Sequence, residues 1–375
     1  MHPLIYDWNK TDAPRPSTVM LDDETLRDGL QSPSVRTPSI DEKLKILHLI
    51  DRLGIDSADI GLPGAGPHVV RDVERLAREI ADQRLRVTAN CAARTVIADI
   101  KPIAEISQRV GLPLEVGAFI GSSPLRQYAE GWTLDQLLRL TEEAVAFAVG
   151  EGLPVLYVTE DTTRADPDTL RALYSTAIRA GAKRICIADT VGHATPHGTA
   201  ALVKFVAGVV EECGGGVGID WHGHRDRDFA IVNTLAALDA GATRLHGTAI
   251  GIGERVGNTP MDALLMNLVL MGYIERDLSA LCDYCETVSA ATRSAPPPAC
   301  TRPRSSRRSA RTTRSSSTPS IRRSPRVSSG ASSRSTSARC RGSRTSSSGS
   351  SAMAMPRPTS SSIASSPRRS RHRRC

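Results

Sequence analysis

The feature that most constrains the fold is a regular alternation of short β-like runs with longer amphipathic stretches. Eight β-like runs begin at residues 19, 57, 86, 113, 155, 184, 217 and 244. Strands that alternate with helices pair in parallel through right-handed crossovers. Eight such units in about 250 residues predict an α/β fold, the (β/α)8 TIM barrel. The alternative is a doubly wound open sheet, which usually has fewer strands and a glycine-rich turn after the first strand. Here the first run ends in charged residues instead.

The stretch between the first two runs carries the signals of a helix that covers the barrel. Ser39 and Glu42 have the spacing of a capping box at its start. The apolar residues that follow recur at helical spacing: Ile46, Leu47, Ile50 and Leu53. This pattern predicts a helix with one face packed on the sheet.

The uneven distribution of charge divides the chain into three parts. All 40 acidic residues lie before residue 291, whereas the last 85 residues hold 20 of the 48 basic ones, all of them arginines. We expect a polar lead-in over residues 1–18, an acidic barrel over 19–290 and a Ser/Arg-rich tail over 291–375. The tail has almost no large apolar residue, so it is expected to be disordered.

Two explanations fit the composition of this tail. A basic arm that binds nucleic acid would use its arginines to neutralise phosphates. The tail, however, has no Lys, no aromatic residue and no RGG or RS repeat. A GC-rich gene that is read out of frame gives mainly Arg, Ser, Pro, Ala, Thr and Gly. The abrupt change of composition near Arg293 favours such a frameshift, and nucleic acid is not the expected partner.

The sequence shows no sign of a membrane or secreted protein. No stretch is apolar for long enough to span a bilayer, and the first residues lack the basic end and apolar core of a signal peptide. The 8 cysteines are scattered, which suits a reducing compartment, so we expect a cytoplasmic protein. Cys282 and Cys285 form one C-x-x-C in a helical pattern, and we expect them to pack rather than to bind metal or exchange electrons.

Polar residues gather where the predicted strands end. In a (β/α)8 barrel the active site lies at the carboxyl ends of the strands. The residues at or just after these ends are Glu24, Arg27, Asp28, Asp59, Asn90, Ser122, Ser123, Arg126, Glu160, Asp161, Asp189, Thr190, His222, His224, Glu254, Arg255 and Asn258. Residues that only decorate the surface would be scattered over both ends of the strands. Their gathering at one end therefore favours a catalytic site.

His222 and His224 are the most specific of these residues. Residues i and i+2 of a strand share a face, so both imidazoles can reach one ligand. With the Asp28 carboxylate they would form a nitrogen and oxygen site for a divalent cation, which Asn258 could complete. The alternative for the two histidines is a pair of exposed side chains in a turn.

Arg27 has two interpretations, and so has the pair formed by Glu254 and Arg255. Arg27 would lie close to any oxygen that becomes negative during a reaction. Its alternative role is a surface ion pair with Asp23 or Glu24. Glu254 and Arg255 lie in a glycine-rich loop after the last strand, where they could simply pair with each other and hold that loop.

Five segments together resemble the DRE-TIM metallolyase superfamily, which includes 2-isopropylmalate, homocitrate and citramalate synthases and HMG-CoA lyase. The stretch "LDDETLRDGLQ" resembles its signature, and "HGHRDRD" resembles its second metal motif. The segments "EDTTRADP" and "ADTVGHATP" resemble its fifth and sixth strand ends, the loop "GIGERVGNTPMD" resembles its last, and the five segments occur along the chain in the order of the family. The similarity covers residues 19 to about 290.

The resemblance implies a Claisen condensation of acetyl-CoA with a 2-oxo acid, as in 2-isopropylmalate synthase and leucine biosynthesis. It implies a divalent metal (Mg, Mn or Zn) and a homodimer. The implied metal ligands are Asp28, His222, His224 and Asn258. The implied catalytic residues are Arg27, Glu160 and Asp59, with Glu160 as a candidate base. The implied substrate-binding residues are Gln31, Arg126, Thr190 and Glu254.

The chain departs from the family at several positions. Asp59 stands where a glutamate is usual, and Arg126 stands where isopropylmalate synthases tend to have histidine. Arg225 replaces the asparagine that usually follows the second histidine. Leu30 is the residue that the lyases carry, which keeps an HMG-CoA lyase activity as an alternative. The loop "GIGERVGN" is synthase-like and lacks the cysteine of those lyases.

The largest departure follows residue 290. The family continues into a helical lid that helps to close the active site, and the arginine-rich tail shows nothing recognisable there. We therefore expect weak or absent activity for this chain, and turnover at the rates of the family would contradict that expectation.

Overall fold

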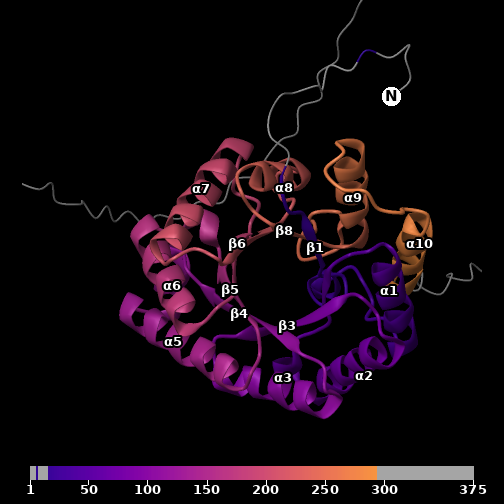
Figure 1. Cartoon of the computed structure of the whole chain (residues 1–375), viewed down its shortest axis with the longest axis horizontal. Coiled ribbons are helices and arrows are strands. Elements are labelled where there is room, and N and C mark those ends of the chain that lie inside the picture. The colour runs from indigo at the N-terminus through magenta and orange to yellow at the C-terminus, as the bar shows by residue number, and fades with distance from the viewer. Residues whose placement is uncertain (1–5, 7–15, 294–375) are drawn as a thin grey trace, which may run out of the picture. The chain divides into compact units, whose positions relative to one another are not determined.

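Eight parallel strands form a closed barrel in the computed structural model, which describes residue 6 and residues 16–293. Most of the predicted lead-in and nearly all of the predicted tail lie outside the described residues. The strands are β1 Met20–Asp23, β2 Ser57–Asp59, β3 Thr88–Arg94, β4 Leu114–Gly121, β5 Val155–Glu160, β6 Arg184–Asp189, β7 Gly218–Gly223 and β8 Arg244–Gly247. They follow one another around the barrel in chain order, and β8 pairs with β1 (Figure 1). The predicted TIM barrel is confirmed, and the open sheet is excluded.

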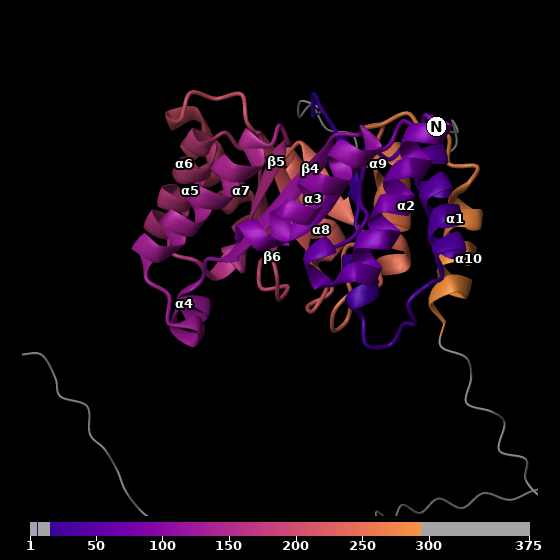
Figure 2. The same cartoon turned by 90° about the horizontal axis from the view of Figure 1, so that it is seen from below.

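Helices surround the barrel on its outside (Figure 1). They are α1 Ile40–Arg52, α2 Pro67–Gln83, α3 Ile97–Val110, α4 Pro124–Glu130, α5 Leu134–Gly150, α6 Pro167–Ala180, α7 Pro196–Glu212, α8 Ala230–Asp239, α9 Met261–Leu270 and α10 Leu281–Thr292. The short helix α4 follows the carboxyl end of β4 and stands apart from the outer ring in Figure 2. No helix among the described residues is both long enough and apolar enough to cross a membrane.

The start of α1 has the capping box that its sequence predicts. The Ser39 side chain accepts a hydrogen bond from the Glu42 backbone, and the Glu42 carboxylate accepts one from the Ser39 N–H at 2.8 Å. Two of the four backbone donors at the helix start are thereby satisfied. The predicted apolar face is buried: Ile46, Leu47, Ile50 and Leu53. Capping and burial therefore agree on where this helix begins and which way it faces.

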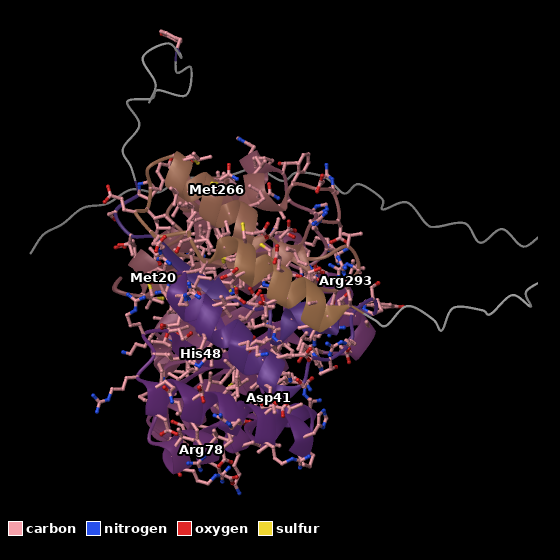
Figure 3. The ribbon with its side chains drawn as sticks, turned by 90° about the vertical axis from the view of Figure 1, so that its right-hand side faces the viewer. Met20, Asp41, His48, Arg78, Met266 and Arg293 are labelled. Carbon is pink, nitrogen blue, oxygen red and sulfur yellow. The ribbon has the colours of Figure 1, made fainter. Side chains whose placement is uncertain are left out.

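Helix α10 is the last helix of the described residues and packs along α1, as Figure 3 shows. The Arg36 N–H donates to the carbonyl of Thr292 at 2.9 Å, so the helix is held at its last turn. It extends two residues beyond the boundary predicted at residue 290. The expectation that both cysteines of the C-x-x-C pack is wrong for Cys282, which is exposed, whereas Cys285 is half-buried.

The amino-terminal half of the barrel interior holds charged side chains rather than only apolar ones. Arg184 and Arg244 begin β6 and β8, and both donate from Nε to the buried Asp220 of β7 at 2.6 Å. Arg244 also donates to Glu115 of β4 at 2.7 Å. A side chain at residue 218 would collide with Arg184, because an added Cβ would lie 2.4 Å from its guanidinium. Gly218 thus makes room for this ion cluster, which the hydrophobic pattern does not predict.

Candidate metal and substrate site

A cavity of about 250 Å³ opens at the carboxyl ends of the strands. Nine of the eleven residues to which the resemblance assigns a role line it, Asn258 and Arg126 being the exceptions: Arg27, Asp28, Gln31, Asp59, Glu160, Thr190, His222, His224 and Glu254. The cavity has a charged side near β1, β7 and β8 and an apolar side near β3 to β6. The predicted gathering of polar strand ends is therefore present in the folded chain.

His222 and His224 point their Nε2 atoms at the same place. These two nitrogens lie 3.0 Å apart, and they lie 3.9 Å and 3.8 Å from Asp28 Oδ2. The three atoms belong to one of the groups among the described residues that could hold a metal ion. Both rings come from the end of β7, where alternation places positions i and i+2 on one face. His224 is buried, so the alternative of two exposed histidines in a turn does not hold.

Protonation also suits His224 for a role as a metal ligand. Burial and the neighbouring His222 lower the pKa of His224 to about 4, so its ring is neutral at pH 7. A neutral imidazole offers the lone pair that a cation needs. Burial opposes the charge on His222, but the Glu24 carboxylate outweighs burial and raises the pKa of His222.

Asn258 lies against the same group from the loop after β8. Its Nδ2 donates to Asp28 Oδ2 at 2.5 Å, and its Oδ1 is buried without a hydrogen-bond partner. A short β-bridge joins residues 224 and 258, which holds Asn258 beside His224. Oδ1 lies against Gly253, where an added Cβ would be 1.9 Å from it, so the amide turns its nitrogen toward Asp28 and its oxygen away. Two imidazole nitrogens and a carboxylate oxygen fit a divalent cation, and the amide oxygen could join them only after the amide turns over.

Arg27 is half-buried and gathers three carboxylates around its guanidinium. It donates to Asp59 Oδ2 at 2.6 Å and to Asp28 Oδ1 at 2.8 Å, and it lies 3.5 Å from Glu24. Burial opposes its charge, but the three carboxylates raise its pKa above the usual arginine value. Arg27 therefore does form the ion pair with Glu24, yet at the cavity rather than at the surface. Asp23 does not take part, because it faces Tyr284 of α10.

Asp59 touches Arg27 and lies outside both groups of described residues that could hold a metal. Its other oxygen accepts the Gly61 N–H at 3.2 Å. Burial raises the pKa of Asp59 to about 7, although Arg27 beside it acts in the opposite direction. The shorter side chain thus reaches the arginine and orients it.

Glu160 and Arg126 face each other at the rim of the cavity. Arg126 belongs to α4 rather than to a plain loop after β4, and its Nη2 lies 3.4 Å from Glu160 Oε2. Glu130 forms the second ion pair of Arg126, at 3.3 Å. Burial raises the pKa of Glu160. The Thr190 hydroxyl accepts the Asp161 N–H at 2.8 Å, so its own proton remains free to donate.

Arg255 links the loop after β8 to the loop after β7. Arg255 donates to Asp226 at 2.8 Å, and its Nη1 lies 3.1 Å from Glu254. The ion pair of the simpler interpretation is therefore present. Glu254 nevertheless lines the cavity, so both interpretations of that residue stay open.

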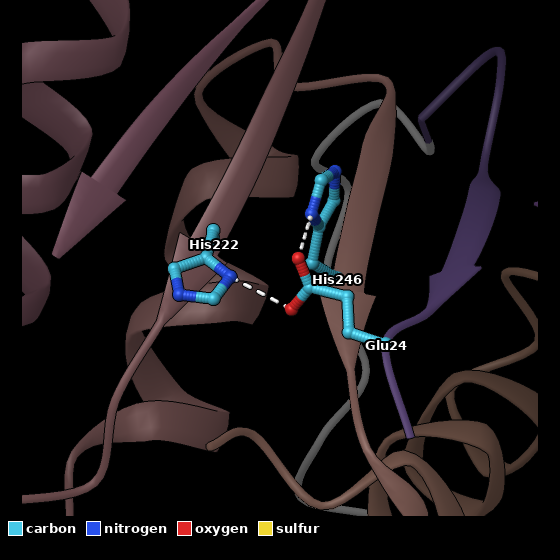
Figure 4. A group of neighbouring side chains, drawn as sticks. All are labelled: Glu24, His222 and His246. Carbon is cyan, nitrogen blue, oxygen red and sulfur yellow. Dashed lines mark hydrogen bonds and ion pairs between the residues drawn. The ribbon is translucent and has the colours of Figure 1, made fainter. Parts of the chain in front are cut away.

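The sequence does not predict which residue contacts Nδ1 of His222, the ring nitrogen that does not face His224. Glu24 lies between His222 and His246, and each of its oxygens contacts one ring (Figure 4). His246 stands two positions after Arg244 on β8, which places both side chains inside the barrel. That alternation is the signal that could have revealed it. Burial opposes the charge on His246, but Glu24 and Asp22 raise its pKa to about 10.

Comparison with known proteins gives a consistent result. The family model described as HMGL-like matches residues 18–291. A 2-isopropylmalate synthase from Sediminispirochaeta smaragdinae is 33% identical over 256 residues, which are 68% of this chain and 49% of that protein. One from Microcystis aeruginosa is 35% identical over 254 residues, which are 68% of this chain and 47% of that protein. The chain thus spans about half the length of the curated relatives it matches.

A solved structure agrees on the fold. The hydroxymethylglutaryl-CoA lyase from Pseudomonas aeruginosa superposes with a TM-score of 0.61 at 22% identity, covering 74% of this chain and 93% of that one. Identity at that level supports the barrel alone. The family model spans all eight strands and the loops that carry the charged side of the cavity. The chain belongs to the HMGL-like family of the DRE-TIM superfamily.

Proposed function

We propose that this chain is an acyltransferase of the 2-isopropylmalate synthase type, which joins the methyl carbon of acetyl-CoA to the carbonyl carbon of a 2-oxo acid and releases CoA when water hydrolyses the thioester. One observation carries the proposal. Two imidazole nitrogens and a carboxylate oxygen converge beside an arginine, at a cavity whose opposite side is apolar. The similarity to the 2-isopropylmalate synthases of Sediminispirochaeta smaragdinae and Microcystis aeruginosa supports the same class of reaction.

The charged side of the cavity is proposed to hold a divalent cation. Asp28, His222 and His224 would be its ligands, and Asn258 would add its amide oxygen once its side-chain amide has turned over. Mg, Mn and Zn are all compatible with mixed nitrogen and oxygen ligands. When bound, such an ion acts as a Lewis acid toward the oxo group and its carboxylate.

Arg27 is proposed to stabilise the oxygen that becomes negative when the new carbon–carbon bond forms. Its guanidinium already lies in place, held by Asp59 and Asp28 at 2.6 Å and 2.8 Å. A charge that is fixed before the reaction stabilises the transition state without reorganisation. Asp59 is accordingly a positioning residue, which acts through Arg27.

Glu160 is proposed to accept the proton that leaves the methyl group of the acyl-CoA. It lines the cavity at the end of β5, and its pKa is raised by burial, which makes its carboxylate a stronger base. Arg126 holds that carboxylate at the rim. Thr190 is proposed to donate its free hydroxyl proton to the oxo acid, and Gln31 and Glu254 to contact the substrates from their places on the cavity wall.

The apolar side of the cavity favours an oxo acid with a short hydrocarbon side chain. Its larger residues are Leu62, Phe119, Leu156 and Val158. Between them lie Ala92, Gly117 and Ala188, which leave space beside the strands. A branched aliphatic chain buries its surface there at a gain of about 0.8 kcal/mol per methylene. We therefore propose 2-oxoisovalerate as the preferred acceptor.

The test is an assay of CoA release from acetyl-CoA with Mn²⁺ or Mg²⁺. Pyruvate, 2-oxoisovalerate and 2-oxoglutarate are supplied in turn, and Asp28→Asn serves as the inactive control. We expect slow release with 2-oxoisovalerate, because the family's lid is not recognisable after residue 290, and we expect this release to depend on added metal and to be lost in the variant. Release no faster than that of Asp28→Asn with every acid, measured at high enzyme concentration with a protein that binds Mn²⁺, would overturn the acyltransferase proposal.

The same preparation tests carbon–carbon cleavage. HMG-CoA is supplied with the metal, and formation of acetyl-CoA is followed. Cleavage of HMG-CoA without any condensation would assign the chain to the lyases instead. The structural similarity to an HMG-CoA lyase makes this the sharpest competing outcome, although it supports only the fold.

A further inference from the structure

Glu24 joins two histidines that come from neighbouring strands, the half-buried His222 and the buried His246 (Figure 4). Its Oε2 lies 2.7 Å from His222 Nδ1, and its Oε1 lies 2.9 Å from His246 Nδ1. Glu24 and His246 are both buried, with 4% and 3% of their surface exposed. Both oxygens are at hydrogen-bond distance from a histidine nitrogen, and Oε1 also lies 3.5 Å from Arg27 Nη2.

His246 is held on its far side as well. Its Nε2 lies 2.9 Å from Asp220 Oδ2, so each ring nitrogen of His246 faces a carboxylate. An ionised carboxylate can only accept hydrogen bonds, so both nitrogens of His246 must donate. Asp220 is fixed in turn by Arg184 and Arg244, each at 2.6 Å. The orientation of His246, and with it that of Glu24, is determined by the charged interior of the barrel.

The contact with Glu24 has a consequence for His222. Its Nδ1 must carry a proton to donate to Glu24, which leaves the lone pair of a neutral ring on Nε2. That Nε2 atom is the one that lies 3.0 Å from His224 and 3.9 Å from Asp28. The contact thus selects the tautomer that a cation at this place requires, and it fixes the plane of the ring.

We propose that Glu24 and His246 are positioning residues of the metal site. Glu24 accepts the Nδ1–H of His222 and thereby presents Nε2 to the cation. His246, anchored on Asp220, keeps Glu24 in that orientation. This inference rests on the proposed metal site for its effect on affinity, but the tautomer of His222 is a property of the metal-free protein.

The strand pairing explains why the chain of contacts is rigid. In the ladder between β1 and β8, Asp22 pairs with His246, and the Glu24 N–H donates to the Gly247 carbonyl at 2.8 Å. In the ladder between β7 and β8, Asp220 pairs with Arg244. All members of the chain therefore lie on three adjacent strands whose register is fixed by backbone hydrogen bonds.

A second arrangement of the same residues is the main competitor. Glu24, His222 and His246 form the other group of described residues that could hold a metal ion. An ion there would occupy the place of the two shared protons and would use Nδ1 of His222. It would then not need Asp28 or His224. The two arrangements differ in which carboxylate the affinity depends on.

The first experiment reads the tautomer directly. Metal-free protein labelled with ¹⁵N-histidine is studied by long-range ¹H–¹⁵N NMR at a pH high enough for the His222 ring to be neutral, because Glu24 raises the pKa of that ring, and His222→Asn identifies its signals. We expect the Nδ1–H tautomer in the wild type and loss of this preference in Glu24→Gln. An Nε2–H tautomer in the wild type would overturn the proposal, whether or not the protein binds a metal.

The second experiment measures Mn²⁺ affinity by calorimetric titration of the full chain. Glu24→Gln and His246→Phe are compared with Glu79→Gln on α2, a half-buried glutamate that lies 2.8 Å from His48 Nε2 and does not line the cavity. We expect affinity to fall about 10- to 100-fold in the first two variants. The control is expected to stay within about twofold of the wild type. Circular dichroism melts confirm that each variant is folded.

Mn²⁺ binding by the wild type and the variants distinguishes a failure of the proposed metal site from a failure of the positioning role of Glu24 and His246. If the wild type binds no Mn²⁺, the proposed metal site fails, and the NMR experiment alone decides the role of Glu24. If the wild type binds and Glu24→Gln binds equally well, the positioning role is overturned while the metal site stands. If Asp28→Asn binds normally and His246→Phe does not, the ion belongs to the group of Glu24, His222 and His246, which also overturns the proposal.

Discussion

Arg27 Nε donates to Asp59 Oδ2 at 2.6 Å, across the carboxyl ends of β1 and β2. The family usually has a longer acid at residue 59, and the shorter one still reaches the arginine. Without this carboxylate the guanidinium would keep Asp28 and Glu24 as partners but lose the contact that fixes its Nε edge. Loss of this contact is therefore expected to impair catalysis more than folding.

Asp59→Ala is expected to lower kcat of CoA release by roughly 10²-fold, because a small displacement of a catalytic charge costs about that much. KM for the oxo acid is expected to change little, since Asp59 acts through Arg27. The matched control is Asp99→Ala. Asp99 does not line the cavity, and the change removes the carboxylate that lies 2.7 Å from Arg94 Nε. Equal losses in both variants would show that stability, and not the position of Arg27, is responsible.

Glu160→Gln tests the proposed base. We expect kcat to fall by about 10²- to 10⁴-fold, the range that general base catalysis supplies. A base must be deprotonated to act, so wild-type kcat is expected to fall as the pH drops through the pKa of Glu160, which burial raises. The acid limb of the profile should disappear in the variant. A variant with normal kcat would assign the base to another residue.

Gly117 tests the proposed choice of substrate. An added Cβ would lie 3.5 Å from the carbonyl of Cys91, which is ordinary contact, so Gly117→Ala fits the strand. Gly117→Val would then fill space on the apolar side of the cavity. We expect kcat/KM for 2-oxoisovalerate to fall about 10-fold or more in the valine variant, with a smaller loss for pyruvate. Equal losses for the two acids would place the side chain of the substrate elsewhere.

The barrel and half of the site follow from local sequence patterns. Strand–helix alternation is a repeated local signal, so all eight strands are predicted near their observed positions. His222 and His224 are two residues apart on one strand, so their shared face needs no knowledge of the fold. Arg27 and Asp28 likewise adjoin a predicted strand, and the barrel rule places that end at the active site.

The remaining contacts depend on how distant strands meet. Glu24 and His222 are 198 residues apart, and they touch because the closed barrel brings β1 close to β7. A hydrophobic pattern shows that Asp220 lies in a strand but not which cation will face it. Helix α4, which carries Arg126, is not among the helices that the sequence pattern predicts, since it has only 7 residues.

The buried pair of Asp23 and Tyr284 gives a prediction about stability and pH. The Tyr284 hydroxyl donates to Asp23, and the Thr25 N–H donates to the same carboxylate at 2.9 Å. Burial nevertheless raises the pKa of Asp23 from 3.8 to about 6. A raised carboxyl pKa means that the folded state binds the proton more tightly than the unfolded state. The stability gained from this proton is fully present below pH 3.8 and is lost as the pH rises through 6.

Asp23→Asn removes this dependence while it keeps the shape of the side chain. Its amide can donate to the Tyr284 hydroxyl, which can turn its own proton to Thr25 Oγ1 at 3.3 Å. We expect the variant to be more stable than the wild type by up to about 3 kcal/mol at pH 8, because each unit of pKa shift corresponds to about 1.4 kcal/mol. Below pH 4 the two proteins are expected to have the same free energy of unfolding. Urea denaturation at pH 4, 6 and 8 measures the difference, and a variant that is less stable at pH 8 would show that the ionised Asp23 stabilises the fold as an acceptor for Tyr284.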